Sequence, residues 1–360
     1  MRVIVVGAGI IGRSVAWRLA QRGAAVTVVD PDPSRSAARV AAGMLAPVTE
    51  AHFGEDDLLA LNLESAGRWP RFAAELGCEA GAAADPGYVE SGTLLVARDL
   101  DDRRELDRLA AYLESRGRAV EPLDARSLRR REPALGVSTR GGLWVAGDHQ
   151  VNPRATLEAL ASAGARRGVA EVAAAAVAVE SQRVELAGGR VLDADAVVTC
   201  AGWSTRDLVG VPLRPVKGQV VRLGTTSRAV LPTHVIRGLD VYVVPRPDGE
   251  IVVGATSEEV GPDRTVTAGG VRALLEEAWR LLPGLDEAPL RECSAGLRPA
   301  TPDGAPVLDT VEGVHVATGH HRNGVLLAPV TADAVAAAVC DGAWPELTDP
   351  FRLDRFTAVP

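Results

Sequence analysis

The stretch that decides the fold is Arg2–Asp30, RVIVVGAGIIGRSVAWRLAQRGAAVTVVD. It begins with an apolar run, continues with a helical repeat of Ile11, Val15 and Leu19, and ends in a second run rich in valine. Because apolar residues one helical turn apart form one face of a helix, and β-branched runs favour strands, this order predicts a strand, a helix and a second strand. The chain therefore opens with a βαβ unit.

Three glycines in this stretch have the GxGxxG spacing, directly after the first strand and at the start of the helix. In that context the first glycine permits a tight turn, the second lets a pyrophosphate approach the backbone, and the third lets the helix pack on the sheet. The helix dipole then faces the phosphates, and Asp30 can accept hydrogen bonds from a ribose. Strand, helix and terminal acid together make an ordinary glycine-rich turn the weaker interpretation. We assign a dinucleotide site to Gly7, Ala8, Gly9, Ile10, Ile11, Gly12 and Asp30, although the motif does not separate FAD from NAD.

Composition narrows the class of protein. The 360 residues carry a net charge of −8, with 47% hydrophobic and 24% charged residues, as in ordinary globular enzymes. A nucleic-acid partner or an anionic membrane has little electrostatic support. Four widely spaced cysteines predict buried, reduced thiols, and the absence of a leader-like or membrane-spanning segment predicts a cytoplasmic protein. His320 and His321 have no third ligand at suitable spacing, so no metal site is expected.

The remaining pattern predicts helices and strands in an order that returns the chain more than once to the opening unit. Asn152 and Pro153 are a typical helix start. The expected helices are 58–76, 102–116, 153–168 and 271–282, and a last one ends near 340; the expected strands are 172–180, 181–191, 193–202, 215–223, 240–246, 250–256 and 314–317. The strands between 215 and 256 predict an antiparallel sheet.

Several blocks of the chain resemble, in the same order, the D-amino-acid oxidase family of FAD-dependent amine oxidases. The blocks are RVAAGMLAPVTE at 39–50, PVKGQ at 215–219, VYVVPR at 241–246, VVGATSEE at 252–259, AGLRPATPDG at 295–304 and GHHRNGVLLAPVT at 319–331. The RNGxLLxP ending is more similar to the glycine oxidases of that family than to sarcosine oxidases or eukaryotic D-amino-acid oxidases. The resemblance implies FAD as the cofactor.

The same resemblance implies which residues contact the cofactor and the substrate. Arg298 matches the arginine that pairs with the substrate carboxylate, a role that suits the planar fork of a guanidinium. Tyr242 matches a tyrosine of the substrate pocket, and Arg322 a second arginine beside it. The small side chains of Ala41, Ala42 and Gly43 would let the flavin ring lie against the backbone, and Met44 would pack on it. The further cofactor contacts are Ala176, Val177, Ala201, Gly202, Trp203, His321, Arg322, Asn323, Gly324, Val325 and Leu326.

The implied fold is α/β. A Rossmann-like FAD-binding domain (1–80, 145–212 and 295–360) is interleaved with an α+β substrate-binding domain on an antiparallel sheet (81–144 and 213–294). The implied reaction is hydride transfer from the substrate Cα to the flavin, giving an imino acid, with oxygen then reduced to hydrogen peroxide. Glycine is the expected substrate, iminoacetate for thiamine thiazole synthesis the expected product, and a homo-oligomer the expected assembly. No dedicated acid or base is nominated, since the protein has mainly to position a neutral amine.

Alternatives remain open at this point. They are a D-amino-acid or sarcosine oxidase, a dehydrogenase that passes electrons to another acceptor, an NAD-dependent enzyme, and a dinucleotide-binding protein without turnover.

Overall fold

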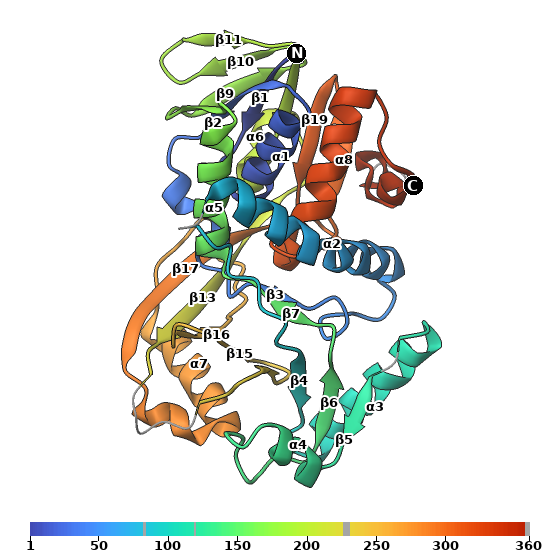
Figure 1. Ribbon diagram of the computed structural model, residues 1–360, viewed down its shortest axis with the longest axis vertical. Coiled ribbons are helices and arrows are strands. Elements are labelled where there is room, and N and C mark those ends of the chain that lie inside the picture. The colour runs from blue at the N-terminus through green and yellow to red at the C-terminus, as the bar shows by residue number, and fades with distance from the viewer. Residues whose placement is uncertain (82–83, 119, 226–230, 357–360) are drawn as a thin grey trace.

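Two large β-sheets organise the computed structural model (Figure 1). The structure describes residues 1–81, 84–118, 120–225 and 231–356, so parts of the predicted domain ranges at 82–83, 119, 226–230 and 357–360 lie outside the described residues. The long strands β13 (Arg214–Leu223) and β17 (Leu290–Ala300) run from the upper to the lower half of the view in Figure 1.

The first sheet has six strands and contains the opening βαβ unit. Its order is β18 (Val307–Val311), β19 (Val314–Thr318), β12 (Ala196–Thr199), β1 (Arg2–Val6), β2 (Ala25–Val29) and β8 (Ala170–Val172). All pairs are parallel except β18–β19. Both faces of a parallel sheet are normally buried. Here helices pack against one face and a small sheet packs against the other. The helices are α1 (Ile10–Gln21), α2 (Asp56–Ala80), α5 (Pro153–Arg166) and α8 (Ala328–Asp341); the small antiparallel sheet is β9 (Ala176–Glu180), β10 (Arg183–Leu186) and β11 (Val191–Asp193).

The second sheet has eight strands. Its order is β17, β13, β16 (Ile251–Gly254), β15 (Tyr242–Pro245), β14 (Val235–Arg237), β4 (Thr93–Val96), β6 (Gly142–Val145) and β5 (Glu121–Leu123). Alternating side chains explain its two buried faces: Val221, Val243 and Val253 pack toward α7 (Ala268–Leu281), whereas Val220, Val244 and Val252 pack toward Met44. This second face packs against the segment 41–44, which the sequence assigns to the flavin.

The remaining elements are short or lie at the edges of the sheets. They are β3 (Met44–Leu45) paired with β7 (His149–Gln150), the helices α3 (Leu100–Ser115), α4 (Ala125–Arg131) and α6 (Thr205–Val209), and the 3₁₀ helices η1 (Pro33–Arg35), η2 (Ala37–Arg39), η3 (Gly202–Ser204), η4 (Pro283–Glu287), η5 (His321–Asn323), η6 (Glu346–Phe351) and η7 (Leu353–Phe356). None of the described helices combines the length and apolar character needed to cross a lipid bilayer.

Most predicted elements are confirmed, and α5 starts as expected, with the Asn152 side chain accepting from two backbone N–H groups and Pro153 in the first turn. Two expectations are wrong in detail. The run 172–180 is not one strand but β8 and β9, which belong to different sheets. The predicted strands β13, β16 and β15 pair antiparallel as expected, and the unpredicted strands β14 and β4 add a parallel pair to their sheet. Of the four free cysteines only Cys200 is buried, and Cys78 is exposed.

Candidate active site

The glycine turn after β1 is shaped by close backbone approaches. Gly7 has φ +106°, and a Cβ there would lie 2.4 Å from the carbonyl oxygen of Cys200. A Cβ on Gly12 would lie 1.8 Å from the carbonyl oxygen of Gly7, so only glycine lets α1 pack this closely on the strand. Gly9 caps α1 without a side-chain hydrogen bond. The first amides of the helix are therefore available to a phosphate.

Asp30 lies just past β2, as the motif requires. Its Oδ2 accepts from the N–H of Ala8 at 2.7 Å, and its Oδ1 accepts from the N–H of Asp32 at 2.8 Å. Each carboxylate oxygen keeps a further lone pair, so the fixed carboxylate can still accept from a ribose hydroxyl.

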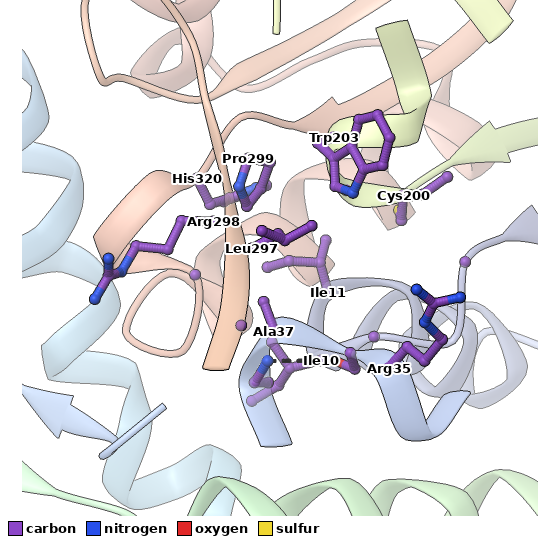
Figure 2. Close-up of a pocket in the computed structure, with 18 of the residues that line it drawn as sticks. Ile10, Ile11, Arg35, Ala37, Cys200, Trp203, Leu297, Arg298, Pro299 and His320 are labelled. Atoms are coloured by element: carbon purple, nitrogen blue, oxygen red, sulfur yellow. Dashed lines mark hydrogen bonds between the residues drawn. The ribbon is translucent and has the colours of Figure 1, made fainter. Parts of the chain in front are cut away.

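One cavity of about 740 Å³ connects the glycine turn with the second sheet. It has the size of a cofactor site. Figure 2 shows Ile10, Ile11 and Leu297 in its middle, with the guanidinium groups of Arg35 and Arg298 at opposite sides of the view.

Most of the predicted site residues line this cavity. They are Gly7, Gly9, Ile10, Ile11, Asp30, Ala41, Ala42, Gly43, Met44, Ala176, Val177, Ala201, Gly202, Trp203, Tyr242, Arg298, His321, Arg322, Gly324 and Val325. Four other predicted residues, Ala8, Gly12, Asn323 and Leu326, do not line the cavity. Gly12 faces Gly7, and the carbonyl oxygen of Leu326 accepts from Ser65 Oγ at 2.6 Å and from Trp69 Nε1 at 2.9 Å.

Three arginines, of which Arg222 and Arg246 are buried, hold the segment 39–42 in place beside the cavity. Arg246 donates to the carbonyl oxygen of Val151 at 2.8 Å and also to that of Ala42. Arg154 donates to the carbonyl oxygen of Arg39 at 2.8 Å, and Arg222 is within 3.5 Å of the carbonyl oxygens of residues 39 and 40. Burial lowers the pKa of Arg246 to about 10, which still leaves it charged. The backbone of this segment is thus fixed by charged donors from the second sheet and from α5.

The carboxyl-terminal loop 319–324 contributes two neutral imidazoles. Burial lowers the pKa of His320 to about 3, and its Nε2 lies 3.0 Å from Thr331 Oγ1. Burial, with the charges of Arg322 and Arg298, lowers the pKa of His321 to about 4. The loop contains the 3₁₀ turn η5 and precedes the helix α8, which begins at Ala328. At neutral pH this wall of the cavity carries no histidine charge.

Arg298 and Tyr242 meet at the second-sheet end of the cavity. Arg298 Nη1 donates to the carbonyl oxygen of Thr256 at 3.1 Å, and its guanidinium lies against Gly218, where a Cβ would come within 2.4 Å of Nη2. The Tyr242 hydroxyl lies against Gly254 in the same way. Burial raises the pKa of Tyr242, so the hydroxyl remains a donor. Two donors therefore converge where a carboxylate would be held.

Arg322 lies at the rim and contacts His52 Nε2. Glu50 lines the cavity beside it, and its carboxylate is 3.9 Å from Arg237. Glu50 belongs to the block 39–50 but was not among the predicted site residues. Arg35, Val220, Pro262, Arg264 and Thr318 also line the cavity and were not predicted. In the sequence, Glu50 could have been recognised as a site residue only because it is a charged residue at the end of a block of mostly small and apolar residues.

Known proteins with similar sequences share this architecture. The family model described as FAD dependent oxidoreductase matches residues 2–338. The glycine oxidase of Geobacillus kaustophilus is 34% identical over 94% of this chain and 92% of its own, and a crystal structure of that enzyme superposes with a TM-score of 0.91 at 31% identity, covering 98% and 99% of the two chains.

The bifunctional protein ThiO/ThiG of Trichormus variabilis is 33% identical over 98% of this chain. The match covers 55% of that relative, so the chain spans about half the length of the first curated relatives it matches. With the family model covering nearly all of the chain, the protein belongs to the FAD dependent oxidoreductase family.

Proposed function

We propose that the protein oxidises glycine, and with lower efficiency other small amines such as sarcosine or small D-amino acids, to the imino acid, with oxygen as the final acceptor and hydrogen peroxide as a product. The observation that carries the proposal is the convergence of Arg298 and Tyr242 at one end of a cavity whose other end has the dinucleotide features. The similarity to glycine oxidases supports the choice of glycine.

The residues present fit FAD. Gly7, Gly9 and Gly12 leave room for a diphosphate beside the first turn of α1, and Asp30 presents an acceptor for a ribose. Ala41–Met44 and the loop 319–325 line the part of the cavity that would hold the flavin. When bound, FAD supplies the hydride acceptor.

The chain's own side chains position the substrate. Arg298 would hold the carboxylate through two parallel charge-assisted hydrogen bonds, and the Tyr242 hydroxyl would donate to the same group. The neutral His321 adds no positive charge that would repel an amine. Holding the carboxylate at the second sheet would fix the substrate in the cavity, and positioning of this kind can supply much of the rate.

The test is peroxide release by the purified protein with glycine, sarcosine, D-alanine and D-proline, alongside its visible spectrum. Peroxide from glycine with a flavin spectrum supports the proposal. A preference for a larger D-amino acid or for sarcosine would move it to a neighbouring oxidase, and bleaching without peroxide would indicate a dehydrogenase. A protein without flavin and without turnover would refute it.

A role of the imino product in thiamine thiazole synthesis is part of this proposal and rests on the resemblance. The cytoplasmic location, the homo-oligomer, the stated domain ranges and the individual site residues also stay predictions.

A further inference from the structure

A strap formed by residues 255–267 joins β16 to α7 and passes over the cofactor cavity. Its anchor is Lys217 on β13, a lysine with 2% exposure. Lys217 Nζ lies 3.0 Å from Glu258 Oε2, 3.1 Å from Asp263 Oδ2 and 3.2 Å from the carbonyl oxygen of Thr265. A buried ammonium needs such compensation, so the strap closes around it.

Gln219, on the same strand, fixes the strap a second time. Its Nε2 donates to Glu258 Oε1 at 2.7 Å and to Thr267 Oγ1 at 3.1 Å, and its Oε1 accepts from the N–H of Thr267 at 2.8 Å. Backbone hydrogen bonds of 2.9 Å in both directions join Lys217 and Glu258. The strap is therefore held near both of its ends by one strand of the second sheet.

Between these anchors the strap extends Pro262 and Arg264 into the lining of the cavity. Arg264 Nη1 donates to the carbonyl oxygen of Arg35 at 2.9 Å, which ties the strap to the segment that follows β2. Its Nε is shielded from solvent and has no acceptor among the described residues. A buried N–H without an acceptor lowers the stability of the fold. A ligand that accepts from this N–H would remove that penalty.

The position of Arg264 relative to the glycine turn indicates which group of a ligand would accept from this N–H. Arg35 also lines the cavity, and the next residue, Ser36, has its Oγ 3.3 Å from the position that a Cβ on Gly9 would take. The segment contacted by Arg264 thus lies directly against the amino-terminal end of α1. Burial and the charge of Arg35 lower the pKa of Arg264, and Asp32 acts in the opposite direction. Two arginines that line the same cavity beside a helix amino terminus favour a ligand with more than one negative charge.

We propose that Arg264 binds the diphosphate of FAD, with Arg35 as a second positive charge, so that the strap of the second sheet helps to hold a cofactor seated on the first sheet. The inference goes beyond the proposed function, because it concerns the retention of the cofactor whichever amine is oxidised. Bound FAD would then link the two sheets through the strap as well as through the flavin end.

The experiment measures the dissociation constant of FAD by following flavin fluorescence as the holoenzyme is diluted. Arg264→Ala should weaken FAD binding by roughly 10- to 100-fold, as expected for loss of one or two charge-assisted hydrogen bonds. Arg264→Lys keeps the charge and should lose less. Arg272→Ala is the matched control, since Arg272 is an exposed arginine on α7; it should bind FAD as the unmutated protein does.

Displacement of FAD by ADP and by adenosine separates phosphate binding from a structural role of the strap. If Arg264 binds the diphosphate, Arg264→Ala raises the dissociation constant of ADP, calculated from the displacement with the variant's own FAD affinity, and leaves that of adenosine unchanged. Equal weakening for both ligands, or an unchanged dissociation constant for FAD, would overturn the proposal. Because no amine is present in these measurements, their result does not depend on whether glycine is the substrate.

Discussion

Replacing Arg298 by alanine should remove most of the affinity for the substrate carboxylate. In the described part of the structure this guanidinium donates to the carbonyl oxygen of Thr256 at 3.1 Å. A guanidinium has five N–H donors, so enough donors remain for a bidentate pair with a carboxylate.

The size of the effect follows from those two bonds. Each hydrogen bond to a charged group contributes about 1.5–3 kcal/mol, so two of them amount to about 3–6 kcal/mol, or about 10²- to 10⁴-fold in kcat/KM. Arg298 is partly exposed, which places the expected loss near the lower limit. Because the carboxylate is bound similarly before and during the reaction, most of the loss should appear in KM.

The assay is steady-state peroxide release with glycine, together with the flavin spectrum and the inhibition constant of acetate. Acetate has the carboxylate without the amine, so its inhibition should weaken in parallel with KM. Arg298→Lys should lose less, since it keeps one charged donor group. Arg291→Ala, which changes an exposed arginine on the same strand, is the control and should leave the kinetics unchanged. Unchanged kinetics in Arg298→Ala with FAD bound would remove Arg298 from this role.

Three further predictions concern the supporting structure. Gly12→Ala places a Cβ 1.8 Å from the carbonyl oxygen of Gly7, so α1 must move off β1; FAD retention and the thermal midpoint should both fall, and full FAD content would contradict the close-packing argument. Arg246→Met leaves the carbonyl oxygens of Ala42 and Val151 without their buried donor. The free energy of unfolding, measured by urea titration, should therefore fall by about 3 kcal/mol. A change near zero would show that other contacts hold the segment 39–42. Asp148 is fully buried, and burial raises its folded-state pKa from 3.8 to about 7, so its stabilising contribution is complete below the unfolded pKa and is lost as the pH rises through about 7. This shift of about three pKa units corresponds to ~4 kcal/mol at most. Asp148→Asn should flatten the decline in unfolding free energy between about pH 4 and about pH 7, and an unaltered slope would show that Asp148 does not titrate there.

The sequence was sufficient for features whose cause is local. The glycine spacing and Asp30 predict the dinucleotide end of the cavity, because turn, helix start and strand end are set by neighbouring residues. The order of the later blocks predicts Arg298 and Tyr242, which line the cavity as expected.

Features that depend on distant pairing were not predictable in the same way. The break between β8 and β9 has no glycine or proline to indicate it, and only the competition between two sheets decides it. The parallel pair of β14 and β4 joins segments far apart in the chain. The role of Arg246 depends on where two carbonyl oxygens from other segments, those of Ala42 and Val151, lie.

The order of strands in the six-stranded sheet has a consequence for how the protein is made. β12 lies between β1, from the first residues of the chain, and β19, from residues near 314. During synthesis one edge of β12 therefore stays unpaired until residues near 314 have left the ribosome, and unpaired edges favour aggregation. The loop 319–325, which contributes lining residues to the cavity, emerges later still. The cavity is therefore complete only after residue 325 has been synthesised, so flavin supply and chaperone capacity at that stage should govern the yield of holoenzyme.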